Sequence, residues 1–233
     1  MPYYLFVNFK TFEEGTGRKA LALAKLLATF HNDSRETEII PVVQAIDLKE
    51  IAASVSMKVF CQHVDPVSFG SNTGKILPEA VKGAGAFGTV LNHAENKRDN
   101  SFIQKAVERC KIAGLKTMLC AETIERAKEL AAFSPDFIAV EPPELIGGNV
   151  SVSTARPELI SDSVKAIKKA DKKIIAITGA GVKNSEDVRK AVELGCSGVF
   201  VASGIVSARD KELVVSELLS GFPAQNRPSF SEP

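Results

Sequence analysis

The feature of this sequence that most constrains its fold is a regular alternation of short apolar runs with amphipathic stretches, from one end of the chain to the other. The apolar runs are nearly continuous, whereas a strand with one face in water would alternate apolar and polar residues. Continuous runs indicate strands that are buried on both faces, as in a parallel sheet. The predicted strands cover residues 3–8, 38–44, 58–63, 88–92, 117–121, 137–140, 173–178 and 198–202.

Amphipathic stretches between these runs predict helices at residues 17–30, 48–54, 78–84, 101–113, 124–133, 156–170, 185–194 and 211–219. Several of them carry boundary signals. Pro78 and Pro157 stand where a first helical turn tolerates proline. Gly114 and Gly195 stand where C-terminal caps occur. The chain therefore reads as a succession of strand–helix units.

Eight such units in 233 residues, with no break in composition, predict an α/β fold: a closed (β/α)8 TIM barrel with eight parallel strands inside a ring of helices. A doubly wound open sheet is the alternative. It is disfavoured because no G-x-G-x-x-G follows the first strand and no second domain is visible. We expect residues 1–222 to form a single catalytic barrel domain and the Pro/Ser-rich residues 223–233 to be a flexible tail.

Charge and cysteine usage exclude several classes of function. The formal net charge is +1, and no block of charge indicates a nucleic-acid or membrane partner. The apolar runs are far shorter than the roughly 20 residues that span a bilayer, and the N-terminus resembles no secretion signal. The four cysteines lack metal-ligand spacing, so we expect no metal site, no disulfide and a cytoplasmic location.

Polar residues at the predicted strand ends are the candidates for chemistry, because the carboxyl ends of the strands form the active-site face of such a barrel. Asn8 and Lys10 close the first strand. They are two residues apart, so both are expected to point inward, with Phe9 outward. A lysine there suits an anionic substrate or a developing oxyanion. A lysine free in solvent, just past the strand, is an equally good interpretation.

The fourth and sixth strands end in groups that can transfer protons. His93 follows the fourth strand, and a helix start after it would favour the neutral imidazole. Glu95 is placed to orient either the lysine or a neighbouring loop. Glu141 ends the sixth strand, where a carboxylate can be aimed into a cleft, and Pro142, Pro143 and two glycines follow it. This pattern predicts a catalytic base under a closing lid.

Glycine-rich turns follow the last two strands, at Gly179-Ala180-Gly181 and Ala202-Ser203-Gly204. Backbone amides and a hydroxyl in this position form the phosphate cradle of many barrels. Two tight turns without a ligand are the simpler interpretation. Their place on adjacent final strands favours a phosphorylated substrate.

Five motifs, taken in order, resemble the triosephosphate isomerase family in its short archaeal form, from residue 3 to residue 221. They are Asn8-x-Lys10, Asn92-His93-x-Glu95-Asn96, Glu141-Pro142-Pro143-Glu144-Leu145-Ile146-Gly147, Gly179-Ala180-Gly181 and Ala202-Ser203-Gly204. The resemblance implies interconversion of dihydroxyacetone phosphate and D-glyceraldehyde 3-phosphate in glycolysis and gluconeogenesis, with no cofactor.

The resemblance also implies the role of each site residue; this family is itself a standard illustration of that division of labour. Glu141 matches the base, His93 the electrophile that polarises the carbonyl, and Lys10 the cation that stabilises the enediolate. Asn8 matches a positioning residue. The phosphate-binding positions match Ile146, Gly147, Gly181, Ala202 and Ser203.

Three positions depart from the commoner family pattern. Ala94 replaces a serine, the lid tip reads Gly148-Asn149 where Thr-Gly is usual, and Gly181 replaces a serine. We expect a modest loss of orientation and altered lid closure, not loss of activity. The segment Ser71-Asn72-Thr73-Gly74 resembles the loop that reaches a neighbouring subunit. A homodimer or homotetramer with Thr73 at the interface is therefore expected.

Two other functions remain as alternatives. A Schiff-base aldolase on a similar barrel would need a lysine in the barrel, usually on the sixth strand, and only Lys10 is a candidate. A phosphosugar-binding barrel without activity would be expected to have lost the base, the lysine or the histidine, and all three are present.

Overall fold

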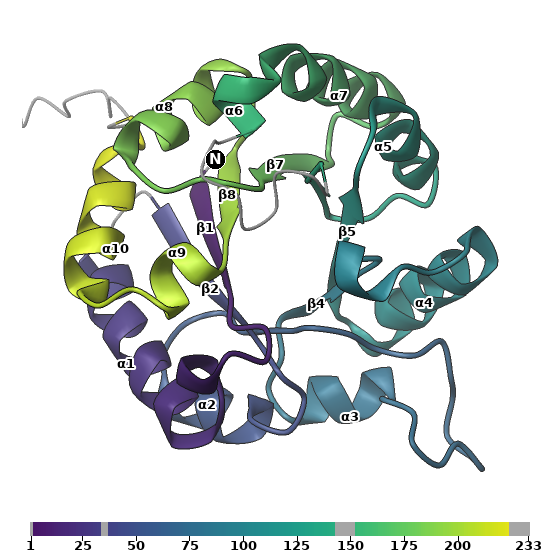
Figure 1. The fold of residues 1–233 in the computed structure, drawn as a ribbon. Coiled ribbons are helices and arrows are strands. Elements are labelled where there is room, and N and C mark those ends of the chain that lie inside the picture. Colours follow the sequence, from purple (N-terminus) through teal and green to yellow (C-terminus); the bar gives the residue numbers. More distant parts are fainter. Residues whose placement is uncertain (1, 34–36, 143–151, 224–233) are drawn as a thin grey trace, which may run out of the picture.

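The structure, a computed structural model, describes residues 2–33, 37–142 and 152–223. In this part of the chain the strands form a closed barrel in which each strand pairs in parallel with the next and β8 pairs with β1 (Figure 1). The predicted (β/α)8 barrel is confirmed. The strands are β1 (Tyr3–Asn8), β2 (Thr37–Val43), β3 (Phe60–Cys61), β4 (Gly88–Leu91), β5 (Lys116–Ala121), β6 (Phe137–Val140), β7 (Ile175–Gly179) and β8 (Gly198–Val201).

Helices surround the barrel and cover its outer face (Figure 1). The helices that the sequence predicts are α1 (Gly17–Asp33), α2 (Leu48–Ser54), α3 (Pro78–Gly83), α4 (Asn100–Ala113), α5 (Ile124–Ala131), α7 (Pro157–Ala170), α8 (Ser185–Glu193) and α10 (Lys211–Ser220). Their ends follow the expected signals. Gly114 caps α4 with φ +72°, and the Asn184 side chain accepts a hydrogen bond from the N–H of Asp187 at the start of α8.

Four short elements were not predicted: η1 (Glu13–Gly15), η2 (Ala94–Asn96), α6 (Val152–Ala155) and α9 (Ser203–Val206). Each is three or four residues long, which is too short for a helical period to show in the sequence. The turn expected after the eighth strand is the start of α9. At β7 the strand begins at Ile175 because the Asp171 side chain holds the N–H of Lys173 in a turn, at 2.8 Å.

The core has two layers, which explains the continuous apolar runs. Along β1, Tyr4 and Phe6 point into the barrel, while Leu5 and Val7 pack against the helices. Phe9 continues the outward face and is fully buried, and Asn8 continues the inward face. The expected orientation of Asn8 is therefore confirmed. Inside the barrel, aromatic rings of four strands meet edge to face around Phe6.

The connection from β3 to α3 extends away from the barrel (Figure 1). Its neck is closed by Asp65, whose N–H donates to the carbonyl of Ile76 at 2.8 Å and whose carboxylate accepts from the N–H of Ile76 at 2.8 Å. Near the tip, Phe69 is 76% exposed and Thr73 is also exposed. The protruding loop that the sequence predicts is present.

Other expectations meet the structure with mixed results. The four cysteines are buried and free, as expected of small apolar residues. His31 is half-buried, and its Nδ1 accepts a hydrogen bond from the N–H of Ile39 at 3.2 Å. No helix in the described residues is long and apolar enough to cross a membrane. The expected tail lies outside the described residues from 224 onward, so it stays a prediction.

Truncation of Phe6, whose aromatic ring lies at the centre of the barrel interior, should destabilise the fold. Phe6 is fully buried and contacts Phe60, Phe137 and Phe200 with ring centroids 5.2–6.3 Å apart. We expect Phe6→Ala to lower the free energy of unfolding by about 3–5 kcal/mol, because it leaves a cavity that four strands cannot close. Leu213→Ala, at a side chain that is 64% exposed, should cost less than about 0.5 kcal/mol. Denaturant unfolding of both variants measures this; equal costs would contradict it.

Candidate active site

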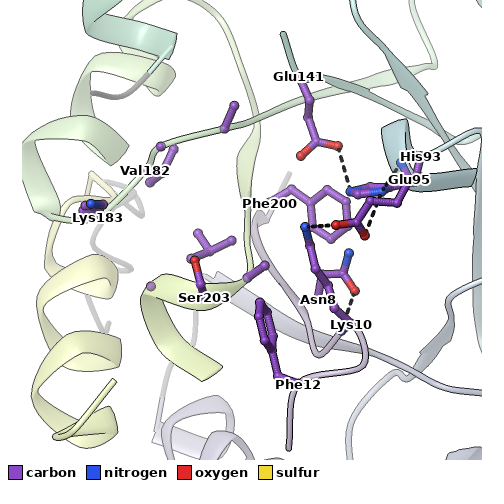
Figure 2. A pocket seen from close by; sticks show the side chains of 15 residues that line it. Asn8, Lys10, Phe12, His93, Glu95, Glu141, Val182, Lys183, Phe200 and Ser203 are labelled. Carbon is purple, nitrogen blue, oxygen red and sulfur yellow. Dashed lines mark hydrogen bonds and ion pairs between the residues drawn. The ribbon is translucent and has the colours of Figure 1, made fainter. Parts of the chain in front are cut away.

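A cavity of about 270 Å³ opens at the carboxyl ends of the strands. Figure 2 shows that Glu141 and His93 point toward one another across it, with Lys10 and Asn8 nearby. The cavity is lined by Asn8, Lys10, Phe12, His93, Glu95, Glu141, Ala180, Gly181, Val182, Lys183, Phe200, Val201, Ala202, Ser203 and Gly204. Eight of the ten predicted site residues therefore line one cavity, although they are spread over nearly the whole sequence.

The backbone of Lys10 is held in an unfavourable conformation. Its φ is +47°, a left-handed value that costs a non-glycine residue about 1–3 kcal/mol. Hydrogen bonds secure both sides: its N–H donates to Asn8 Oδ1 at 3.0 Å, and its carbonyl accepts from Gln62 Nε2 at 2.9 Å. The turn directs the lysine side chain into the cavity. Asn8 therefore acts on the lysine as well as lining the cavity.

The charge of Lys10 is paired with Glu95, as the sequence predicts. Lys10 Nζ lies 2.7 Å from Glu95 Oε1. The lysine side chain is only 14% exposed, whereas that of the glutamate is 60% exposed. An ion pair with one partner in water contributes little to stability. Its main consequence is geometric, because it holds an ammonium group inside the cavity.

His93 lies at the N-terminus of η2, and its ring carries the proton on Nε2. Its Nδ1 accepts a hydrogen bond from the N–H of Glu95 at 3.2 Å, which requires that nitrogen to be unprotonated. Nδ1 also lies 3.5 Å from Glu95 Oε2, a distance that would suit a protonated ring. The neutral form is favoured because burial, and then Lys10, lower the pKa of His93 despite the opposing charge of Glu95.

A second left-handed residue sets the direction of His93. Asn92 has φ +60° and is buried. Its side chain donates to the carbonyl of Cys120 at 2.9 Å and accepts from the N–H of Arg98 at 3.0 Å. Asparagine tolerates this conformation better than most residues. The side-chain bonds fix the turn at the end of β4, so the imidazole faces the cavity.

Glu141 is a buried carboxyl group at the end of β6. It is 6% exposed, and its N–H continues the sheet by donating to the carbonyl of Ala121 at 2.8 Å. Burial raises the pKa of Glu141 to about 7; Glu95 adds to the increase, and the Cys120 thiol and the charge of Lys10 oppose it. The group is therefore half-protonated near neutral pH, where a carboxylate can both take and return a proton.

The imidazole and the carboxyl group lie within reach of one small molecule. His93 Nε2 is 4.0 Å from Glu141 Oε2, and this oxygen has no hydrogen-bond partner among the described residues. A substrate between them could donate a carbon-bound proton to the carboxylate and accept a hydrogen bond from the imidazole. That pairing of base and donor is what proton abstraction beside a carbonyl group requires.

The other side of the cavity is formed by the ends of β7 and β8. Ala180 and Gly181 both have positive φ, at +70° and +75°. Ala202 precedes the short helix α9, and Ser203 is its first residue. Gly181, Ala202 and Ser203 thus come together at the cavity, as the sequence predicts. Figure 2 shows Ser203 on the side of the cavity away from Glu141 and His93.

Some expectations cannot be compared with the structure, because they fall on undescribed residues. Ile146 and Gly147 lie outside the described residues, and so do the lid tip Gly148-Asn149 and most of the predicted lid. Ala94 is described, as the first residue of η2. The N–H of the next residue, Glu95, donates to the imidazole of His93.

Sequence reasoning missed several residues that line the cavity or support its lining. Gln62, which holds the backbone of Lys10, directly follows β3; its position at a strand end was an available signal. Phe200 packs its ring edge to face against His93, with centroids 6.2 Å apart. It lies inside a strand, where an apolar residue reads as core. Lys183 lies beyond the glycine-containing turn, and no sequence pattern marks it as a residue of the cavity.

Comparisons with known proteins identify relatives over most of the chain. The sequence profile described as "Triosephosphate isomerase" matches residues 3–218. The chain is 40% identical over 215 residues to the triosephosphate isomerase of Methanocaldococcus jannaschii, covering 92% of this chain and 98% of that protein. It is 42% identical over 216 residues to that of Archaeoglobus fulgidus, covering 92% and 96%.

A solved structure shares the fold. The crystal structure of triosephosphate isomerase from Bartonella henselae superposes with a TM-score of 0.74 at 18% identity, over 95% of this chain and 98% of that one. At that identity the likeness speaks for the barrel alone. The match of the family profile over most of the sequence, and the relatives near 40% identity, carry the assignment further: this chain belongs to the triosephosphate isomerase family.

Proposed function

We propose that the protein interconverts dihydroxyacetone phosphate and D-glyceraldehyde 3-phosphate through an enediolate, in glycolysis and gluconeogenesis. The observation that carries this proposal is the buried Glu141 carboxyl, with a pKa of about 7, placed 4.0 Å from a neutral imidazole. The reaction moves protons between neighbouring carbon and oxygen atoms and leaves the overall oxidation state unchanged. It therefore needs no redox cofactor.

In the proposed mechanism Glu141 is the base. Its carboxylate takes a proton from C1 of dihydroxyacetone phosphate, and the electrons of the broken C–H bond form the enediolate. The resulting carboxylic acid then returns a proton to C2. Burial favours this role, because a carboxylate poorly solvated in the free enzyme is a stronger base than one in water.

His93 and Lys10 stabilise the negative charge that develops on the substrate oxygens. The Nε2–H of His93 donates to the carbonyl oxygen and shuttles the oxygen-bound proton. The ammonium group of Lys10 holds the charge of the enediolate and of the substrate as a whole. Asn8 and Glu95 act on Lys10, through its backbone and its ammonium group respectively. Fixed donors of this kind need little rearrangement during reaction.

The substrate phosphate is proposed to bind across the cavity, at the backbone amides of Gly181, Ala202 and Ser203. Amides in consecutive left-handed positions and at a helix start are suited to an anion. Ile146 and Gly147 complete this cradle from a lid between Pro142 and Ser153, which excludes water from the enediolate.

The Schiff-base aldolase is not supported. A Schiff-base lysine must bring its amine to the substrate carbonyl, and Lys10 Nζ is instead held 2.7 Å from Glu95 Oε1. β6 ends in Glu141 and supplies no lysine. Borohydride treatment with a triose phosphate should therefore leave no covalent adduct.

The first prediction of this mechanism concerns the length of the Glu141 side chain. Glu141→Asp withdraws the carboxylate by about one methylene, and proton transfer depends on close positioning. We expect kcat in a coupled triose phosphate assay to fall by about two to three orders of magnitude. Glu122→Asp is a matched control at the end of β5, outside the cavity. A loss smaller than about tenfold for Glu141→Asp would exclude Glu141 as the base.

The second prediction concerns pH. The base must be deprotonated, so raising its pKa moves the loss of activity to higher pH. Because the pKa of Glu141 in the free enzyme is about 7, kcat/KM should fall about tenfold per pH unit well below that value and level off above it. Burial lowers the pKa of His93, so the neutral imidazole persists to lower pH than in an ordinary histidine. A kcat/KM profile with a limb near the ordinary glutamate value of 4.5 would contradict this.

We also propose that the protein is cytoplasmic and assembles with itself, as a dimer or tetramer, through the loop that carries Thr73. The exposed Thr73 and Phe69 at the end of a protruding loop support this assembly. The four buried free cysteines support a reducing compartment. Recovery of the activity from a membrane or extracellular fraction would count against this location.

A charge placed on the loop tests the assembly. Thr73→Arg should shift sedimentation toward the monomer and lower kcat, because a charge without a partner is costly to bury in an interface. Thr29→Arg, at an exposed position on α1, should change neither. Wild-type protein that sediments as a monomer with full activity would refute the proposed assembly.

A further inference from the structure

One glycine is constrained by the side chain of Glu141 alone. Gly179 is the last residue of β7, and its backbone is not left-handed, so its φ does not require glycine. A Cβ built on Gly179 would lie 2.5 Å from Oε1 of Glu141 and 2.9 Å from its Cδ and Cγ. These distances are far inside van der Waals contact. The space that a methyl group would need is therefore occupied by the carboxyl group of Glu141.

Other tightly packed glycines of the barrel differ in what surrounds them. A Cβ at Gly198 would meet the carbonyl oxygen of Tyr4 at 2.2 Å, and one at Gly88 would meet that of Lys116 at 2.6 Å, as well as a core ring. A backbone that is hydrogen-bonded in a sheet can move away from an added methyl group only at a large cost in stability. At Gly179 the three nearest atoms all belong to one side chain, which can rotate away. A side chain at this position would cost the fold little and would displace the carboxylate.

The backbones on both sides of this contact are fixed by the sheet. Val140 of β6 pairs with Thr178 of β7, and Thr178 Oγ1 donates to the carbonyl of Val140 at 3.3 Å. Glu141 and Gly179 are the next residues of these two strands, and the N–H of Glu141 is bonded to β5. Because strands in a sheet keep a separation of about 4.8 Å, the carboxyl group is the part that can move.

We propose that Gly179 is a positioning residue, whose missing side chain lets the Glu141 carboxylate lie against β7 and face His93. The proposal rests on the function proposed above. Figure 2 shows the carboxylate pointing toward His93. The titratable and charged groups around it are Cys120 of β5, His93 and Glu95 from the end of β4, and Lys10 from the end of β1. A methyl group on Gly179 pushes the carboxylate away from β7.

Displacement should have two separable effects on the reaction. A shift of about 1 Å in a reacting group can cost about 100-fold in rate, so kcat should fall by about that factor in Gly179→Ala. KM should change by less than about threefold, because the proposed phosphate cradle is untouched. The displaced carboxylate leaves a buried position, so its pKa should decrease, and the acidic limb of the kcat/KM profile should move to lower pH.

The experiment compares wild type with Gly179→Ala and two matched variants. Gly83→Ala adds a methyl where nothing lies within 4 Å, and should leave kcat and stability unchanged. Gly198→Ala should lower the melting temperature, because it strains main chain. Gly179→Ala should melt within about 2 °C of wild type while losing kcat. An unchanged kcat would overturn the proposal. So would a loss of kcat that comes with a drop in melting temperature like that of Gly198→Ala and with the acidic limb of the pH profile at its wild-type position.

Two further experiments cover the cases in which Gly179→Ala does not fold or the protein does not turn over. If Gly179→Ala does not fold, the double variant Gly179→Ala/Glu141→Ala, which removes the three contacting atoms, should fold; failure of both would overturn the proposal. The pKa of Glu141 can be measured by NMR with labelled glutamate, using Glu141→Gln to identify the signal, and should be lower in Gly179→Ala. This readout needs no turnover, so a wild type that does not isomerise trioses would refute the proposed function alone.

Discussion

The parallel pairing of β8 with β1 is the constraint on which the rest of the structure depends. It closes the sheet, so that β1 to β8 leave no strand edge unpaired among the described residues and their carboxyl ends meet at one rim. Lys10, His93 and Glu141 are separated by dozens of residues in the sequence, yet each lies within two residues of the end of a strand. The aromatic rings packed around Phe6 fill the barrel interior beneath Lys10, His93 and Glu141. A closely packed core therefore supports these residues.

The site combines features that are individually unfavourable. Lys10 and Asn92 adopt left-handed backbones, and Glu141 is a carboxyl group with almost no contact with water. Each is held by neighbours that the barrel supplies: Gln62 and Asn8 for Lys10, and the β5 backbone for Glu141. Strain and desolvation of this kind persist only where the surrounding structure is well determined. They are also what gives a carboxylate and an imidazole useful properties near neutral pH.

Much of this was predictable from the sequence, because the strand ends carry polar residues after apolar runs. Asn8, Lys10, His93, Glu95 and Glu141 all line one cavity, and Gly181, Ala202 and Ser203 lie on its other side. The sequence could not show that Lys10 needs a left-handed turn or that Gln62 supports it, since these depend on contacts between distant strands. Short elements such as α9 and η2 were missed because three or four residues carry no periodicity. The protruding Thr73 loop was predicted, and its partner stays a prediction.

The central claim is that the Glu141 carboxylate removes the carbon-bound proton of the substrate. The most direct measurement is exchange of that hydrogen with solvent, followed by NMR for dihydroxyacetone phosphate in deuterium oxide with wild type and Glu141→Gln. Glutamine keeps the shape of the side chain but cannot accept the proton. We predict deuterium at carbon with wild type, and a rate lower by at least about three orders of magnitude with Glu141→Gln, which still binds the phosphorylated substrate. Exchange at a similar rate in both proteins would contradict the account.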